Sequence, residues 1–438
     1  MNIAWFTPFN KQSAIGRFSE CVVRELAKVA TVDLCHFEQG EVRSTPVPVR
    51  RFIGAESVTE RDLARYDMVV YNFGNHLPFH REIFLLSQRH AGLCILHDFS
   101  MHHFFAAFYL EELKSQRLYV SSMERFYGDE GARMAKEGLD GRGRGILESE
   151  EIGRFPLFEA TIPNALGVVA HSEFFASRVR AAFPGPVRRI PLAYEIDRIS
   201  PVPPRQGLGI EDDRVLLITV GHVNPNKQIA SVIEALGDLR LASDRLEYAV
   251  LGLYSPGHRR ELEAIASRCG VSDCVRFLGE VSDETMRAYL THADICVNLR
   301  FPTIEGASAS IIEEMLFGKA VVVTNAGYFH ELPDACVVKV GPGQKEELVC
   351  ALRSLITDAP ARTKLGAAAQ RFAQQEFRAE HYSRALLEFV WEIHSASPLL
   401  NLADRFGQEC SRMGVDSTMQ IVPTIADEIY KTFCKEPN

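Results

Sequence analysis

Two glutamates separated by seven residues, Glu305 and Glu313, have the spacing in this sequence that most clearly indicates a binding site. The residues directly after Glu305 are small: Gly306, Ala307, Ser308 and Ala309. Such residues let backbone N–H groups approach an anion or a sugar, and the helix that they open directs its positive end to the same place. The two carboxylates, one before the helix and one a turn inside it, suit two hydroxyl-bearing parts of one extended ligand. For Glu313, a capping box with Ser310 explains the spacing equally well.

A second candidate group follows an apolar run at residues 215–220, where the chain passes through Gly221 and a polar turn to Lys227. The turn also contains His222 and leads into an expected helix. A cation at that entrance could neutralise a diphosphate, and a histidine beside a phosphate would favour its protonated form. The alternative interpretation of Lys227 is a solvated lysine at a helix start.

Further polar residues follow other expected strands. The pair His97 and Asp98 comes directly after residues 92–96, and Asn72 and Asn75 follow a similar run. Gly16 closes the loop after the first strand, and Gly279 ends the strand near 275–278. In a doubly wound sheet the carboxyl ends of the strands line the ligand crevice, so all of these residues are candidates for contact with a ligand. His102 and His103 are expected on a helix surface.

The elements that would hold these residues alternate between short apolar runs and amphipathic stretches, which is typical of parallel strands joined by helices. Expected strands are residues 2–7, 31–37, 68–72, 92–97, 167–171 and 187–191, and then 215–220, 246–251, 275–278, 295–299 and 320–324. Prolines 201, 203 and 204 favour a linker between two sheets. The predicted organisation is a first Rossmann-like domain at 1–195, a linker at 196–213, a second Rossmann-like domain at 214–376, and a crossover helix with a helical tail at 377–438.

The length, composition and charge of the chain exclude several classes of function. With 438 residues and 46% hydrophobic composition, the chain is long enough for two α/β domains. A net charge of −9 argues against nucleic-acid binding, and the ten cysteines show no metal-binding or disulfide spacing. No apolar run is long enough to span a membrane, and the first strand follows the amino terminus too closely for a signal peptide. A cytoplasmic protein without metal or cofactor is therefore expected.

The E-x7-E block, the following glycine at 318 and the Val-Val-Val strand together resemble the signature of glycosyltransferase family 4. The resemblance covers about residues 2–390 and implies the GT-B fold: two doubly wound parallel-sheet domains facing across a cleft, with carboxyl-terminal helices crossing back. It implies a retaining, metal-independent transfer of a sugar from a UDP- or GDP-sugar to a glycan, lipid-linked or protein acceptor. Surface polysaccharide synthesis, with peripheral contact at the inner membrane face, is a common setting for such enzymes.

The same resemblance implies roles for individual residues. Glu305 would contact hydroxyls of the donor sugar, and Glu313 would bind the ribose. Lys227 matches the lysine of a G-R-x4-K pattern that holds the diphosphate, whereas His222 stands where arginine is usual. His97 would contact the transferred sugar, Gly16 would approach the phosphates, and Gly279 would lie at the nucleobase. Asp98, Asn72 and Asn75 would line the acceptor side, and no enzyme nucleophile is implied.

Two other functions fit the same residues. A nucleotide-sugar epimerase on this scaffold would need acid and base groups but no acceptor cleft. A catalytically silent partner subunit that binds a sugar nucleotide would explain His222 and the unexplained tail at 396–438. Neither the donor base, the sugar, the acceptor, the oligomeric state nor the role of the glycine-rich stretch 138–145 follows from the sequence.

Overall fold

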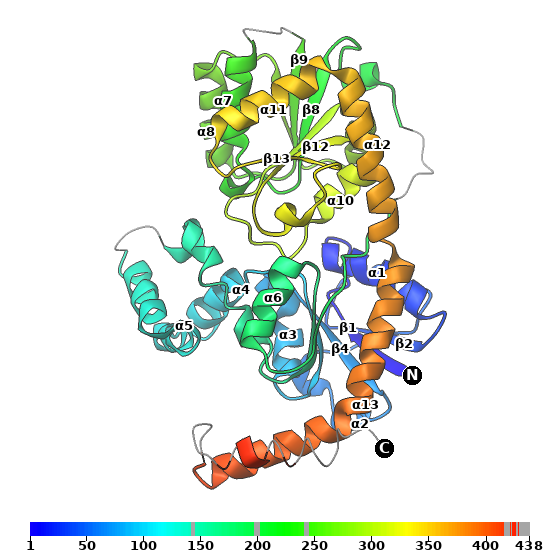
Figure 1. The fold of residues 1–438 in the computed structure, drawn as a ribbon, viewed down its shortest axis with the longest axis vertical. Helices are drawn as coiled ribbons and strands as arrows, with labels where there is room; N and C mark the ends of the chain where they lie inside the picture. The colour runs from blue at the N-terminus through cyan, green and yellow to red at the C-terminus, as the bar shows by residue number, and fades with distance from the viewer. Residues whose placement is uncertain are drawn as a thin grey trace.

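The computed structural model of the protein describes residues 1–141, 145–196, 202–240 and 245–415, together with 421, 423–425 and 428. It contains two α/β units, drawn one above the other in Figure 1. The break between them falls between the last strand of the first sheet and the first strand of the second. Residues 142–144, within the glycine-rich stretch, and 197–201, within the expected linker, lie outside the described residues, as does most of the tail after 415.

The first unit is built on a parallel sheet in the order β3-β2-β1-β4-β5-β6-β7. Its strands are β1 Asn2–Phe6, β2 Thr31–His36, β3 Val49–Arg51, β4 Met68–Phe73, β5 Gly92–Leu96, β6 Ala165–Ala170 and β7 Val187–Arg189. Its helices are α1 Ala14–Leu26, α2 Glu60–Leu63, α3 Leu77–Ser87, α4 His102–Ala106, α5 Gln116–Leu139 and α6 Glu173–Ala182. Helix α5 projects from this unit (Figure 1).

The second unit repeats the plan with a parallel sheet in the order β10-β9-β8-β11-β12-β13. Its strands are β8 Val215–Val220, β9 Leu246–Leu251, β10 Val275–Gly279, β11 Ile295–Asn298, β12 Ala320–Thr324 and β13 Val338–Val340. Its helices are α7 Ile229–Arg240, α8 Pro256–Arg268, α9 Asp283–His292, α10 Ala309–Leu316, α11 Lys345–Thr357 and α12 Ala359–Glu376. In both sheets the strand order reverses beside the first strand, which is where a doubly wound fold opens a ligand crevice.

The apolar runs become strands because helices cover both faces of each sheet. All residues of β4, β5, β9 and β12 are buried, as expected for the interior of a parallel sheet. The sequence pattern therefore predicted the long inner strands. It missed the edge strands β3 and β13, which have three residues each and are only partly buried, so they carry no continuous apolar run.

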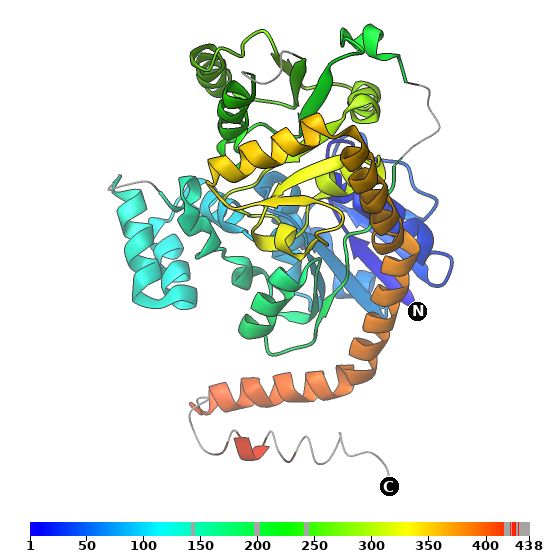
Figure 2. The same ribbon diagram turned by 45° about the horizontal axis from the view of Figure 1, so that its top comes forward.

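Helix α13 (Ala379–Arg412) returns from the second unit to the first and runs beside α1, as Figures 1 and 2 show. The hydroxyl of Ser383 donates to the carbonyl of Val22 at 3.1 Å. Further along, Phe389 and Ile393 pack over Gly167, where a Cβ would lie 2.5 Å from the Cδ1 atom of Ile393. The crossing-back of the carboxyl-terminal helix is thereby confirmed. Near its end α13 bends, and its last turns run below the first unit in the view of Figure 1.

The expectation for His102 is wrong. Its side chain is fully buried between the carbonyl of Phe155 and the hydroxyl of Tyr119, since the stretch after α5 folds back over α4. His103 is exposed, as expected. Among the described residues, no helix is long and apolar enough to cross a membrane.

Candidate active site

The two units meet through backbone hydrogen bonds at the carboxyl ends of β5 and β11. Asp98 and Glu305 form an antiparallel bridge. On either side of it, the N–H of Gly306 donates to the carbonyl of His97 at 3.1 Å, and the N–H of Ser100 donates to the carbonyl of Ile304 at 2.9 Å. We call residues 97–100 and 304–306 the domain bridge. Two segments that sequence reasoning predicted to face one cleft are thus in direct contact.

Gly306 is the point of closest approach. A Cβ on this residue would lie 2.8 Å from the carbonyl oxygen of His97 and 2.8 Å from the ring of Phe175. Its carbonyl also accepts a hydrogen bond from the Ser172 hydroxyl at 2.7 Å. Both backbone groups of Gly306 therefore form hydrogen bonds between the units. The N–H of Gly306 was expected to be available to an anion, but in this structure it donates to His97. Ala307, Ser308 and Ala309 follow and lead into α10, whose first N–H groups have no partner within the helix.

A second contact between the units lies nearby. The carboxylate of Glu331, from the second unit, accepts hydrogen bonds from the N–H of Glu173, at 2.9 Å, and of Phe174, the first residues of α6. An acidic side chain at a helix start is stabilised by the free N–H groups and by the helix dipole. This contact holds the two units together beside the domain bridge.

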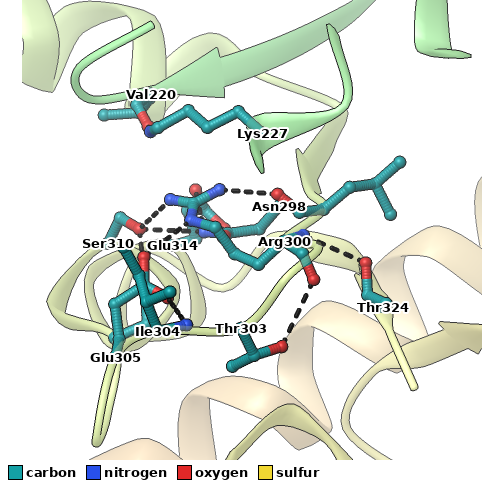
Figure 3. Close-up of polar contacts among 12 residues, drawn as sticks. Val220, Lys227, Asn298, Arg300, Thr303, Ile304, Glu305, Ser310, Glu314 and Thr324 are labelled. Atoms are coloured by element: carbon teal, nitrogen blue, oxygen red, sulfur yellow. Dashed lines mark hydrogen bonds and ion pairs between the residues drawn. The ribbon is translucent and has the colours of Figure 1, made fainter. Parts of the chain in front are cut away.

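Lys227 is buried rather than solvated. Its ammonium donates to the carbonyl of Val220, and it lies above Arg300 and Glu314 in Figure 3. Burial and then the neighbouring Arg300 lower the pKa of Lys227 well below its usual value, while Glu305 and Glu314 oppose that shift. The space for the ammonium comes from Gly221, with φ of +99°, where a Cβ would lie 2.6 Å from Nζ.

Arg300 and Glu314 complete this charged cluster, and neither residue belongs to a motif that marks it in the sequence. The guanidinium of Arg300 is 4% exposed and donates to Glu305 Oε1 at 3.2 Å and to the Ser310 hydroxyl at 3.4 Å (Figure 3). Glu314 is fully buried and accepts from the amide of Asn298 at 2.9 and 3.0 Å. Burial raises the pKa of Glu314 to about 7. We call Lys227, Arg300, Glu305 and Glu314 the charged cluster.

Glu313, from α10 of the second unit, lies near Arg17 and Tyr194 of the first unit. Its carboxylate hydrogen-bonds to the hydroxyl of Tyr194, and the guanidinium of Arg17 lies close to it. Burial raises the pKa of Glu313, and Arg17 opposes the shift. The capping box with Ser310 is absent, because the N-cap position of α10 is Ser308, whose side chain makes no capping hydrogen bond, and the Ser310 hydroxyl accepts from the Asn298 amide instead. Glu313 therefore does not cap helix α10.

The structure also shows the surroundings of three further candidates, Gly16, His222 and Gly279. The N–H of Gly16 donates to the hydroxyl of Ser13, the cap of α1, so it is not open to a phosphate in this structure. His222 is exposed on the loop after β8. Gly279 ends β10 with φ of +75°, a backbone conformation that favours glycine.

Both ring nitrogens of His97 contact protein groups. Nε2 lies 3.1 Å from the amide oxygen of Asn72, and Nδ1 lies 3.2 Å from Nε2 of His171. Asn72 is fully buried behind His97 and also donates to the carbonyl of Phe6 at 3.0 Å. The expected place of Asn72 on the acceptor side is therefore wrong. Its side chain is fully buried between His97 and Phe6 and is not accessible to an acceptor.

Asp98 lies in the domain bridge, whereas the side chain of Asn75 is directed to α4, where its amide oxygen accepts from the N–H of Phe104 at 2.8 Å. The N–H of Asn75 donates to the carboxylate of Asp98 at 2.8 Å. Burial raises the pKa of Asp98 to about 6; the Asn75 bond opposes the rise, and Glu305 across the bridge adds to it. Two carboxylates from different units therefore approach each other where the units touch. Among the described residues, no group of His, Cys, Asp and Glu is arranged to hold a metal ion.

Comparison with known proteins assigns the second unit to a family. Residues 204–372 match the family described as Glycosyl transferases group 1. The D-inositol 3-phosphate glycosyltransferase of Geodermatophilus obscurus is 32% identical over 121 residues, 25% of this chain and 26% of that protein. The MMP alpha-(1->4)-mannosyltransferase of Mycolicibacterium hassiacum is 28% identical over 169 residues, 38% of this chain and 39% of that protein. These matches span between about a quarter and two fifths of the relatives' lengths.

Solved structures resemble nearly the whole chain. Sucrose-phosphate synthase from Thermosynechococcus elongatus has a TM-score of 0.61 at 16% identity, and covers 90% of this chain and 100% of its own. Anabaena HepE has a TM-score of 0.62 at 19% identity, with the same two coverages. At these identities the likeness concerns the fold. The chain has the GT-B fold, and its second unit is a glycosyl transferases group 1 domain.

Proposed function

We propose that this protein is a glycosyltransferase that moves a sugar from a nucleotide-diphosphate sugar to a glycan, lipid-linked or protein acceptor. The observation that carries the proposal is the charged cluster at the domain bridge, within a glycosyl transferases group 1 domain. Buried cations beside a partly open carboxylate provide charges for a diphosphate and acceptors for sugar hydroxyls at one point. The similar proteins support the proposal: two relatives are transferases by name, and the structure of HepE is a complex with UDP-glucose.

In the proposed reaction, the donor lies between the units, mainly on the second. Lys227 and Arg300 stabilise the charge that develops on the departing diphosphate, because buried cations act in a low local dielectric without reorganising. Glu305 accepts hydrogen bonds from the sugar, and Glu313 holds the ribose at the crevice beside Tyr194. The transfer is metal-independent and retains the anomeric configuration, with no covalent intermediate on the protein.

Asp98 is the first-unit residue best placed to meet an acceptor hydroxyl. Its carboxyl group has a pKa raised to about 6, so it is mostly ionised at neutral pH yet is a stronger base than an exposed aspartate. In the proposed complex, Asp98 and Glu305 lie on the same side of the transferred sugar, next to each other at the domain bridge.

The first experiment is a thermal-shift panel of UDP, GDP, ADP and their sugars, since a ligand that binds only the folded protein raises its apparent stability. The donor that stabilises the protein is then incubated with and without an acceptor pool, and the products are resolved by mass spectrometry and NMR. Acceptor-dependent transfer with an unchanged anomeric configuration supports the proposal. Donor isomerisation without acceptor would indicate an epimerase, and binding with no turnover in any pool would indicate a silent partner subunit.

A further inference from the structure

His97 and His171 belong to one continuous chain of hydrogen-bonding groups beneath the domain bridge. The chain begins at the carbonyl of Ile190, which lies 3.0 Å from Nδ1 of His171. It continues from His171 Nε2 to His97 Nδ1 at 3.2 Å, and from His97 Nε2 to the Asn72 side chain at 3.1 Å. It ends where the Asn72 amide meets the carbonyl of Phe6 at 3.0 Å.

This chain has one hydrogen too few when both imidazoles are neutral. Its four contacts need four hydrogens, and neither terminal carbonyl carries one. A neutral imidazole supplies one N–H, and the Asn72 amide supplies one N–H to the chain in either orientation, so the three groups supply three. The count does not depend on the tautomers or on the orientation of the amide. One contact must set lone pair against lone pair unless a further proton is bound.

Burial opposes that proton. His97 and His171 are 8% and 1% exposed, and burial lowers the pKa of both, that of His171 to about 4. His80 from α3 further lowers the pKa of His97. The rings of Phe18, from α1, and Tyr382, from α13, close the remaining sides, and neither carries a charge at neutral pH. Two acidic residues, Asp98 and Glu305, adjoin His97 and Gly306 in the domain bridge.

A negatively charged ligand would favour the protonated form of the pair. The backbone of His97 is itself part of the domain bridge, because its carbonyl accepts the N–H of Gly306. A diphosphate bound at the charged cluster would therefore lie near the pair in a site with little water, where opposite charges favour the protonated imidazole.

We propose that His97 and His171 act as one unit that takes up a single proton when a nucleoside-diphosphate donor binds, with His171 as the positioning residue for His97. This inference rests on the proposed function. The proton comes from the buffer and stays on a ring nitrogen, so no other bond is formed or broken. The completed chain fixes the His97 ring under the domain bridge and adds one positive charge beside the bound diphosphate.

The test is calorimetric titration with UDP at one pH in buffers of different ionisation enthalpy, which gives the number of protons taken up on binding. Wild type is expected to take up about one proton more than His171→Leu, because that substitution removes two contacts and leaves a chain that neutral groups complete. His171→Gln is expected to keep the uptake, since an amide again makes both contacts and His97 still receives the proton. The titration of UDP, Asp98 and Glu314 is common to all variants and cancels in the difference.

His102→Gln is the matched control. His102 is also a buried histidine of the first unit, but its two contacts, with the Phe155 carbonyl and the Tyr119 hydroxyl, are already complete with neutral groups. Its proton uptake should equal that of wild type. A second measurement is ¹⁵N-histidine NMR of wild type with UDP, in which both nitrogens of one ring should be protonated. That ring is assigned by comparison with His97→Gln.

Equal uptake by wild type and His171→Leu, or two neutral rings in the UDP complex, would overturn the inference while leaving the proposed function in place. If UDP, GDP and ADP all fail to bind wild type, the proposed function fails and this inference with it. The binding isotherm and the proton count are separate quantities in the same titration, so the two failures are distinguishable.

Discussion

The substitution Gly306→Ala tests the domain bridge with a single methyl group. The added Cβ would meet the carbonyl oxygen of His97 and the ring of Phe175, each at 2.8 Å. Neither neighbour can move easily, since one is backbone and the other is a buried ring. The variant should therefore separate the two units at this point rather than repack around the methyl group.

The size of the effect follows from the contacts. Overpacking of this kind costs about 1–3 kcal/mol, and opening the bridge also loses the hydrogen bonds of Gly306 with His97 and Ser172, worth about 0.5–1.5 kcal/mol each. Even a loss near 2 kcal/mol corresponds to a roughly thirtyfold decrease in the population of the closed form. We expect kcat/KM for sugar transfer to decrease by at least about tenfold.

The assay compares kcat/KM and melting temperature for Gly306→Ala and for Gly257→Ala. Gly257 lies in the exposed first turn of α8 with nothing within 4 Å of a Cβ. Both variants should melt near wild type, because opening the contact between the units moves the added methyl group away from His97 and Phe175 and leaves each unit folded. A kcat/KM for Gly306→Ala within twofold of wild type would refute the reasoning.

Three further predictions concern charge. Lys227→Met should remove the cation at the diphosphate and lower kcat by about 100-fold or more with the fold intact by circular dichroism, whereas Lys345→Met, which breaks an exposed pair with Asp238, should not; equal activities would contradict the role of Lys227. Asp98→Asn should raise stability at pH 8 by about 1–3 kcal/mol, and the gain should shrink by pH 5. The sign follows because the folded pKa of Asp98, about 6, exceeds its ordinary value of 3.8: its stabilisation is complete below the ordinary value and is lost as pH rises through about 6. A constant gain across this range in urea titrations would refute the assignment. Transfer should also persist in excess EDTA, and its abolition, with recovery on adding Mg²⁺ or Mn²⁺, would show a metal requirement.

The sequence determined the architecture because the architecture depends on local, repeated patterns. Apolar runs such as residues 246–251 and 320–324 become fully buried strands, and the helices between them force a parallel sheet in each unit. The position of polar residues directly after those strands also predicted which loops form the crevice. Glu305, His97 and Asp98 lie at the domain bridge for that reason.

Only the tertiary structure decided which of these side chains remain open to a ligand. Arg300 is a lone arginine after β11, and Glu314 is the second of two adjacent glutamates, so neither has a local pattern that separates it from a solvated residue. Their burial beside Lys227 comes from packing of α10 against β11 and β12. In the same way, the buried contacts of Asn72 and His171 with His97 join residues 25 and 74 positions apart. Contacts between distant segments depend on how sheets, helices and whole units pack, and spacing along the chain contains no record of that packing.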